Sequence, residues 1–367
     1  MKWVLYNLTT TTSSGGVEMS VWALGRELAR RGHQVTIYGG ASPRSLPSWA
    51  GELEMLTFPY RRREEFPNLG SRAIKFMERL SFARRALPEL RRRGFERLLV
   101  FKPFDLGPAL WARRGTRGKV GFLSGGTETY PGLAWLARRL DYLGSVSAFN
   151  AGQIAGVMGR HPQVNHLGVD PELFRPVPPD RELAARCGLA SGDEILVTAV
   201  RLVALKGVQR AIRALAALAE ARPGLKLLVA GEGPYRPELE RLAAELGLAG
   251  RVCFTGFLDP ARLAGFYALG QVAVFPSMGE EALGLSIAEA MACGLPVAAS
   301  RLGGVPEVVG DLGALVPPKD DQALARAINE LLGDPEQRSE LSRRGRERVL
   351  REFSWSACAE RLERGLA

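Results

Sequence analysis

The sequence predicts an α/β protein with two domains, each built around a parallel sheet. Its 367 residues favour two domains over one. Short apolar runs alternate with helix-length segments through the second half, and a strand–helix–strand pattern opens the first half. The composition, 46% apolar and 24% charged, is that of a globular protein, and no apolar run reaches the roughly 18 residues of a membrane span.

The first half opens with a strand, a loop rich in hydroxyl groups and glycine, and a helix. The helix is expected at 17–31, where apolar residues recur at helical spacing. Gly15 and Gly16 precede it and let a ligand approach the backbone, although a plain tight turn accounts for the same pair. The strands expected in this half are 2–8, 35–38, 98–101, 119–123 and 145–148.

Basic residues concentrate in the first half. Residues 1–170 carry 25 Lys/Arg against 13 Asp/Glu, whereas 171–367 carry 24 against 26, so the first half holds the whole excess behind the net charge of +10. In the densest segment, 60–97, apolar and basic residues alternate at helical spacing, and Pro88 should bend or restart the helix. A solvated face over a core accounts for this pattern, and so does contact with an anionic membrane. The aromatic residues do not interleave as a stacking platform, which argues against nucleic acid.

A proline-rich passage, PELFRPVPPD, begins at Pro171 and marks a domain boundary near residue 168. Beyond it, the regular alternation predicts a doubly wound parallel sheet whose ligands bind at the carboxyl ends of the strands. The expected strands are 195–200, 226–230, 252–254, 272–275, 297–299 and 314–316. The expected final helices are 320–332, 335–351 and 353–366.

The segment after 272–275 combines a strand end, a glycine and a helix start, which favours anion binding. Gly284 and Leu285 open a helix whose first amides have no intrahelical acceptors. Glu281 precedes this helix and Glu289 lies inside it, so both carboxylates can face one ligand. The combination suits a ligand with hydroxyls and a phosphate, such as a nucleotide sugar. A surface acid before a buried amphipathic helix is the alternative interpretation.

Two other loops carry groups that suit a diphosphate. Arg201 and Lys206 follow 195–200, and two cations at one strand end can hold a diphosphate, although each alone is an ordinary surface charge. The turn 231–234 contains a GxG, but Arg236 stands where a dinucleotide-binding GxGxxG motif needs its third glycine.

The run EEALGLSIAEAMACGLPVAAS, residues 280–300, resembles the signature of retaining glycosyltransferases of the GT-B fold, family 4, or glycosyl transferases group 1. Leu283 stands where Phe is usual. The segments 201–207, 231–234 and 303–307 match further elements of the family, so the resemblance covers nearly the whole chain and is most specific in the second half.

The resemblance implies two Rossmann-like domains that face each other across a cleft. Residues 1–168 would bind the acceptor and 169–351 the nucleotide sugar, and a last helix within 352–367 would return to the first domain. This domain assignment rests on analogy with the family.

The resemblance also implies transfer of a hexose from a nucleoside diphosphate sugar to an acceptor hydroxyl, with retention at the anomeric carbon. The implied catalytic residues are Arg201 and Lys206, which stabilise the departing diphosphate, and Glu281, which holds sugar hydroxyls. The implied donor-binding residues are Gly16, Gly231, Gly233, Pro234, Phe254, Gly256, Gly284, Leu285 and Glu289, the last of them on the ribose. The chain has no Asp-x-Asp metal motif, so the cations would replace a metal, and no cofactor is expected.

The acceptor is expected beside Ser124, Gly125 and Thr127. It would be a glycan, a lipid-linked molecule or a small molecule. An ordinary loop that caps a helix accounts for these residues about as well. Many family members have a His at the position of Ser124, so either the loop has shifted or the enzyme works without it.

Two alternatives share this fold: a catalytically silent subunit that binds nucleotide sugar or membrane, and an epimerase acting on a nucleotide sugar. The presence of Arg201, Lys206, Glu281 and Glu289 together argues against the first, and the scarcity of His, three in the chain, argues against the second.

The cysteines and the N-terminus bear on location. Cys187, Cys253, Cys293 and Cys358 lack metal-site spacing and are expected to be reduced. The N-terminal stretch is too short and too polar for a secretory signal. We therefore expect a cytoplasmic protein, with peripheral contact at the inner face of the membrane through 60–97.

Overall fold

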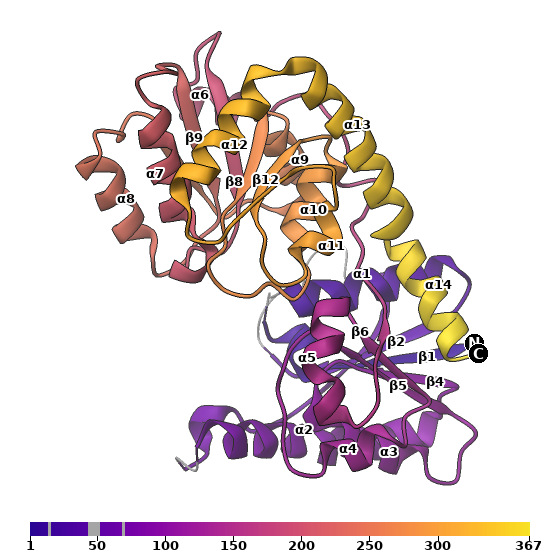
Figure 1. Cartoon of the computed structure of the whole chain (residues 1–367). Helices are drawn as coiled ribbons and strands as arrows, with labels where there is room; N and C mark the ends of the chain where they lie inside the picture. The colour runs from indigo at the N-terminus through magenta and orange to yellow at the C-terminus, as the bar shows by residue number, and fades with distance from the viewer. Residues whose placement is uncertain (14–15, 43–51, 68–69) are drawn as a thin grey trace. The chain divides into compact units, whose positions relative to one another are not determined.

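The computed structural model describes residues 1–13, 16–42, 52–67 and 70–367. The chain forms two compact units (Figure 1). Met1–Gly168 and Trp355–Ala367 make up the first unit, and Val169–Ser354 make up the second. Each unit is a parallel sheet with helices on both faces, so the predicted α/β class is confirmed.

The sheet of the first unit has seven parallel strands in the order β3-β2-β1-β4-β5-β6-β7. The strands are β1 (Lys2–Tyr6), β2 (Gln34–Gly40), β3 (Glu54–Phe58), β4 (Arg97–Val100), β5 (Lys119–Ser124), β6 (Tyr142–Ser145) and β7 (Gln163–Val164). The strand expected at 145–148 was placed three residues too late. Ser147 instead caps the next helix by accepting a hydrogen bond from the amide of Asn150, which ends the extended segment.

Helices cover both faces of this sheet because successive side chains of a strand point to opposite sides. Val4 and Tyr6 pack in one cluster with apolar residues of α2–α5, whereas Leu5 faces Gly25 of α1. Figure 1 shows α1 on one side of the sheet and α2, α3 and α4 on the other. The helices are α1 (Gly16–Arg30), α2 (Ser71–Arg93), α3 (Leu106–Arg113), α4 (Leu133–Ala137), α5 (Ala148–Met158) and α14 (Trp355–Gly365).

The basic helix α2 runs through Pro88 without a restart. A proline inside a helix removes one backbone hydrogen bond. Ala86 and Leu90, on either side of it, are fully buried in the core, and this packing favours continuation of the helix.

The sheet of the second unit has six parallel strands, as the alternation predicted, and their order is β10-β9-β8-β11-β12-β13. The strands are β8 (Glu194–Ala199), β9 (Leu225–Ala230), β10 (Val252–Gly256), β11 (Val272–Phe275), β12 (Val297–Ser300) and β13 (Ala314–Val316). The helices are α6 (Arg181–Arg186), α7 (Val208–Leu218), α8 (Arg236–Glu245), α9 (Pro260–Tyr267), α10 (Leu285–Ala292), α11 (Val305–Val309), α12 (Asp321–Gly333) and α13 (Pro335–Glu352).

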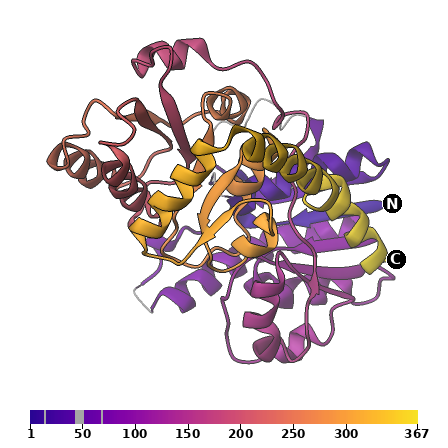
Figure 2. The same ribbon diagram turned by 45° about the horizontal axis from the view of Figure 1, so that its top comes forward.

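Two helical layers also cover the second sheet. Helices α7, α8 and α12 share one apolar cluster with strand residues such as Leu196. Helices α9, α10 and α11 lie against the other face, and α13 packs along α10, where Arg346 donates to the carbonyl of Ala292 (Figure 2). The neighbouring strands β9, β8 and β11 are parallel, so their carboxyl ends lie at one edge of the sheet.

The last helix, α14, belongs to the first unit. Its Glu363 accepts from Arg31 at 2.6 Å and contacts Nε2 of His33 at 2.7 Å. Further along the helix, Nε of Arg361 donates to Oδ1 of Asn165 at 2.9 Å. Arg31, together with His33, holds the pKa of Glu363 at about 2. These contacts tie the end of the chain to its beginning.

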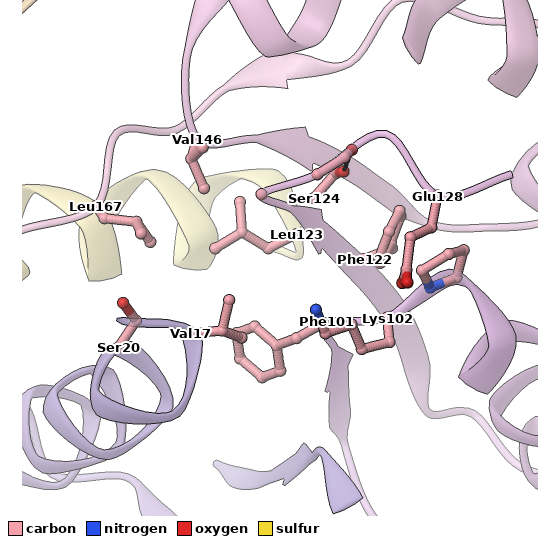
Figure 3. A pocket seen from close by; sticks show the side chains of 13 residues that line it. Val17, Ser20, Phe101, Lys102, Phe122, Leu123, Ser124, Glu128, Val146 and Leu167 are labelled. Carbon is pink, nitrogen blue, oxygen red and sulfur yellow. Dashed lines mark hydrogen bonds between the residues drawn. The ribbon is translucent and has the colours of Figure 1, made fainter. Parts of the chain in front are cut away.

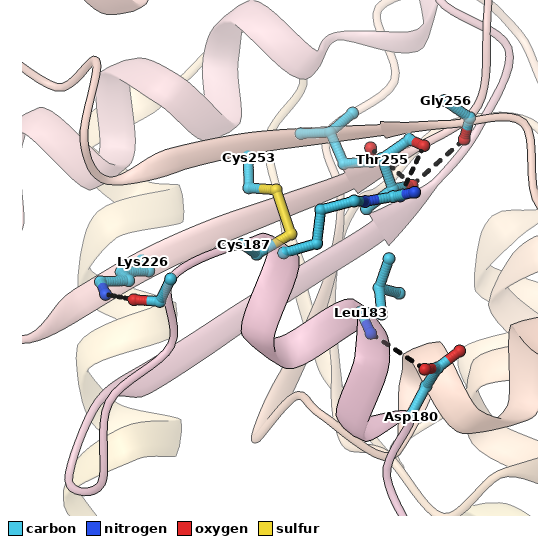
Figure 4. The surroundings of a disulfide bond; sticks show 10 residues. Asp180, Leu183, Cys187, Lys226, Cys253, Thr255 and Gly256 are labelled. Atoms are coloured by element: carbon cyan, nitrogen blue, oxygen red, sulfur yellow. Dashed lines mark hydrogen bonds between the residues drawn. A yellow bond between two sulfur atoms is a disulfide. The ribbon is translucent and has the colours of Figure 1, made fainter.

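Two of the four cysteines form a disulfide, which corrects the expectation that all four are reduced. Cys187 follows α6 and Cys253 lies on β10, with 5.6 Å between their Cα atoms (Figure 4). Their separation of 66 residues gave no local signal, because only the fold brings the edge strand beside α6. Cys293 and Cys358 are free and buried.

Candidate functional site

Three loops meet at the carboxyl edge of the second sheet. The loop after β8 is linked on one side to the loop after β9, since the amide of Leu202 donates to the carbonyl of Glu232 at 2.9 Å. It is linked on the other side to the loop after β11, since the amide of Met278 donates to the carbonyl of Leu205 at 2.8 Å. The strand order places these loops side by side, and backbone hydrogen bonds hold them there.

Glycines allow this close approach. Gly207 has φ of +74°, and a Cβ there would collide with the carbonyl of Pro276. Side chains at Gly231 and Gly233 would collide with carbonyls of the loop after β8. The amide of Gly231 also donates to the carbonyl of Gly256 on β10 at 2.8 Å. The predicted GxG turn is therefore a packing element of the site, whatever its contact with a ligand.

The two side chains predicted from separate motifs, Lys206 and Glu281, touch. Nζ of Lys206 lies 2.5 Å from Oε1 of Glu281, and the hydroxyl of Ser277 donates to the same oxygen at 2.9 Å. Both side chains are partly buried, with 31% and 18% exposed. The carbonyl of Glu281 accepts from the amide of Gly304 at 2.8 Å, so the loop at 303–307 fixes the backbone of this carboxylate.

Arg201 sits in the same loop as Lys206 but has a different environment. It is exposed, and within the described ranges its guanidinium has no carboxylate partner. Arg201 therefore leaves five N–H donors for a ligand.

Helix α10 begins at the same edge. Gly284 caps it with φ of +97°, and the amides of Leu285 and Ser286 have no acceptor in the described part of the chain. Glu289 lies in this helix and is half-buried, and burial raises its pKa to about 7. The edge thus combines two cations, free amides and the carboxylate of Glu281, with Glu289 inside the adjoining helix. Such a set of groups suits a phosphate-bearing polyol.

Phe254 and Gly256, two of the predicted donor-binding residues, lie on the edge strand β10. The guanidinium of Arg236 lies over the ring of Phe254, 5.7 Å from its centroid. Gly256 has φ of +78°, which places it in the left-handed region. Pro234 follows Gly233 in the adjoining turn.

The first unit has a pocket of its own at the carboxyl ends of β4 and β5 (Figure 3). Ser124 and Gly125, two of the residues expected on the acceptor side, line this pocket, whereas the neighbouring Thr127 is not among its lining residues. Val17 of α1 also lines it, next to Gly16, the first residue of that helix. Gly15 lies outside the described residues. Apolar side chains form most of the remaining wall: Phe101, Pro103, Phe122, Leu123, Val146 and Leu167.

Two charged residues of this pocket, Lys102 and Glu128, were not predicted from the sequence. Oε1 of Glu128 accepts from Nζ of Lys75, on α2, at 2.5 Å. Burial opposes ionisation, yet Lys75 and Lys102 hold the pKa of Glu128 below its ordinary value. Lys75 and Glu128 are 53 residues apart and share no motif, so no sequence pattern predicts their contact.

A second, fully buried ion pair lies nearby. Arg79 of α2 is paired with Asp105, and burial raises the pKa of this Asp to about 6 despite the Arg. The other oxygen of Asp105 has no hydrogen-bond donor within the described ranges.

The described residues contain neither a metal-binding cluster nor a membrane-spanning helix. No group of three or more His, Cys, Asp or Glu side chains is placed to hold a metal ion there. None of the described helices has the length and apolar character needed to cross a bilayer.

Two family models together match most of the chain. The model described as Glycosyl transferases group 1 matches residues 180–348, and the model described as Glycosyltransferase Family 4 matches residues 14–173. The first match spans the three-loop edge, and the second spans the pocket of the first unit.

Curated relatives carry related names. The chain is 34% identical over 276 residues to the GDP-mannose-dependent alpha-(1-6)-phosphatidylinositol monomannoside mannosyltransferase of Mycolicibacterium smegmatis, covering 70% of this chain and 72% of the relative. It is 36% identical to the MMP alpha-(1->4)-mannosyltransferase of Mycolicibacterium hassiacum, covering 61% of this chain and 53% of that one. The chain thus spans about half to three quarters of these relatives.

Solved structures share the fold. The sucrose-phosphate synthase of Thermosynechococcus elongatus superimposes with a TM-score of 0.81 at 23% identity, over 99% of this chain and 97% of that one. The Anabaena protein HepE, in complex with UDP and glucose, gives 0.81 at 20% identity, over 100% and 99%. At these identities the likeness establishes the architecture alone.

Proposed function

Because the chain belongs to family 4 of the GT-B glycosyltransferases, the glycosyl transferases group 1, we propose that it moves a hexose from a nucleoside diphosphate sugar to an acceptor hydroxyl, with retention at the anomeric carbon. The observation that carries the proposal is the contact between Glu281 and Lys206, which shares its loop with Arg201, a residue that has no carboxylate partner among the described residues. It joins a phosphate-binding group and a hydroxyl-binding group at one edge. GDP-mannose, named for the mycobacterial relatives, is the first donor to test.

In the proposed reaction, Arg201, Lys206 and the first amides of α10 stabilise the negative charge that grows on the departing diphosphate. An ammonium group has three N–H donors, so Lys206 can keep its bond to Glu281 and still donate to a phosphate oxygen. Lys206 is held by Glu281 and the amides belong to the helix backbone, so both are in place before the donor binds, as electrostatic stabilisation of a transition state requires. They supply the positive charge that a metal ion would otherwise bring, so we propose that the reaction proceeds without one.

We propose that the two carboxylates bind the remaining parts of the donor, the transferred sugar and the ribose. Oε1 of Glu281 is occupied by Lys206 and Ser277, which leaves Oε2 for sugar hydroxyls. Glu289, with its pKa near 7, is proposed to bind the ribose. The acceptor oxygen attacks the anomeric carbon on the face that the diphosphate leaves. The carbon–phosphate oxygen bond breaks as the new glycosidic bond forms, and the leaving phosphate takes the acceptor proton.

We propose that the acceptor binds in the pocket of the first unit, beside Ser124 and Gly125, and that α2 contacts an anionic membrane. Helix α2 carries eight Lys/Arg and two Glu, and it exposes Phe76 and Leu80 to the extent of 46% and 50%. A helix with basic and apolar residues of this kind suits the surface of a bilayer. Such contact would hold the protein peripherally on the inner face of the membrane, next to a lipid-linked acceptor.

A thermal-shift screen of UDP-, GDP- and ADP-sugars without added metal tests the donor site. A nucleotide sugar at 100 times its Kd should add about 2.7 kcal/mol to the free energy of unfolding. Stabilisation by one nucleotide class identifies the donor, and radiolabelled transfer from that donor in the presence of a chelator then tests turnover. If no nucleotide sugar stabilises the protein, the proposal is wrong.

A further inference from the structure

We propose that the pocket of the first unit binds a phosphate group carried by the acceptor, and that Lys102 is the residue that holds it. The inference rests on the proposed function, because it names the chemical class of the acceptor. A phosphate monoester and a phosphate diester share the chemistry that this pocket would recognise.

Lys102 occupies an unusual place for an ammonium group. It lies two residues beyond the end of β4, is half-buried, and extends among the apolar side chains of the pocket (Figure 3). In the described part of the chain its Nζ makes no ion pair and no hydrogen bond. Two other partly buried lysines, Lys206 and Lys226, are each paired with a carboxylate. Partial burial of an unpaired charge is unfavourable, and an anionic ligand would remove this penalty.

The nearby carboxylates are already engaged by other cations. Glu128 is bound to Lys75, and Asp105 is bound to Arg79. The cluster of three cations and two carboxylates therefore keeps at least one positive charge in excess, and that charge is at Lys102. A local excess of this sign attracts an anion into the pocket.

The loop after β5 offers further donors. Gly125 and Gly126 are exposed, and their amides have no acceptor among the residues that the structure describes. Gly126 and Lys102 both line the pocket. Successive free amides beside an ammonium group form a concave anion site. A neutral acceptor would use neither feature.

The test uses the full-length protein, saturated with the nucleoside diphosphate that stabilises it, so that the donor site is blocked. Glycerol 3-phosphate is then titrated by calorimetry, with glycerol as the uncharged comparison. We expect binding of glycerol 3-phosphate and none of glycerol. Lys102→Gln should weaken binding at least tenfold, whereas Lys102→Arg should retain it. The matched control Lys2→Gln removes an exposed lysine of the same unit and should have no effect.

Glu128→Gln should change the affinity for glycerol 3-phosphate in the opposite direction from Lys102→Gln. It removes the negative charge nearest the site and should tighten binding at least threefold. Vesicles of phosphatidylglycerol, tested in the Phe76→Ser/Leu80→Ser background so that α2 contributes little to binding, distinguish a lipid diester from a soluble monoester. Lys102→Gln will reduce binding only of the form that the pocket accepts. Unchanged binding of both phosphates in Lys102→Gln would overturn the inference. Stabilisation by a nucleotide sugar is measured separately on the wild type and on each variant. If the wild type itself is not stabilised by any nucleotide sugar, the proposed function is wrong, whatever the phosphate titrations show.

Discussion

Nζ of Lys206 lies 2.5 Å from Oε1 of Glu281, although 75 positions separate the two residues in the chain. One lies in the loop after β8 and the other in the loop after β11, and these strands are neighbours in the sheet. Because the two strands are parallel neighbours, the loops that follow them lie side by side, and their opposite charges form one ion pair.

Replacement of Lys206 by Ala should lower kcat/KM at least a hundredfold, a change of about 2.7 kcal/mol in transition-state stabilisation. The variant loses a charge on the diphosphate and leaves Glu281 without its cation. Lys226→Ala is the matched control, because Nζ of Lys226 is also paired, 2.7 Å from Asp193, but lies on β9 near its amino end. A reduction of less than tenfold in steady-state turnover for Lys206→Ala would show that the assignment is wrong.

Gly207→Ala should impair folding and donor binding together. The residue has φ of +74°, and the added Cβ would meet the carbonyl of Pro276 in the neighbouring loop. Gly247→Ala is the control, with φ of +68° but open space around the added atom, so only the backbone penalty of about 1–2 kcal/mol applies. Urea unfolding should show a larger loss for Gly207→Ala, and this variant alone should lose stabilisation by nucleotide. Equal losses in the two variants would contradict the packing role of this glycine.

Much of the fold could be predicted from the sequence, because buried parallel strands are regularly spaced apolar runs bounded by turns. Strands such as 272–275 are short apolar runs bounded by turns, and the structure has β11 at Val272–Phe275. The segment 145–148 misled because Val146 and Ala148 are apolar, while Ser147 caps a helix. Capping by a serine overrode the apolar pattern there.

The candidate site residues also fall into two groups: those that a local pattern predicts and those that depend on long-range contacts. The residues of the second unit lie in loops directly after predicted strands, and sheet order alone brings them to one edge. The pocket of the first unit depends on contacts between α2 and distant loops, as in Lys75 with Glu128 and Arg79 with Asp105. Such pairs leave no periodic signal, so sequence analysis found the loop at Ser124 but not the charges opposite it.

Reduction of the disulfide should lower the free energy of unfolding by up to about 4 kcal/mol, because the bond between Cys187 and Cys253 closes a loop of 66 residues. Urea titrations with and without a reducing agent measure the difference. The double variant Cys187→Ser/Cys253→Ser should unfold equally in both conditions. Thiol titration of the unfolded, unreduced protein should find two free cysteines, and a count of four would show that the bond does not form.

Stability at acid pH should depend on Glu363. Arg31, together with His33, lowers the pKa of this carboxyl to about 2 in the folded protein, whereas the unfolded value is near 4.5. The stabilisation, about 1 kcal/mol once solvent screening of this partly exposed pair is allowed for, is therefore present above pH 4.5 and is lost as the pH falls toward 2. Glu363→Gln should destabilise the protein at pH 7 and leave its stability at pH 2 nearly unchanged. Glu360→Gln, on the same helix, is the control. A pH-independent difference between wild type and Glu363→Gln would contradict the role of the ion pair.

Helix α2 should bind anionic vesicles through both its charge and its exposed apolar residues. Phe76 and Leu80 are about half exposed although the helix packs on a core, and Arg72 and Arg84 lie nearby in sequence and are exposed. Phe76→Ser/Leu80→Ser should reduce sedimentation with phosphatidylglycerol vesicles at least fivefold. Phe257→Ser, which removes an aromatic side chain that is 65% exposed in the second unit, serves as the control. Binding should weaken as salt is raised, since a Debye length of about 8 Å at physiological ionic strength screens exposed charges. Binding that ignores lipid charge and salt would exclude the membrane surface as the partner of this helix.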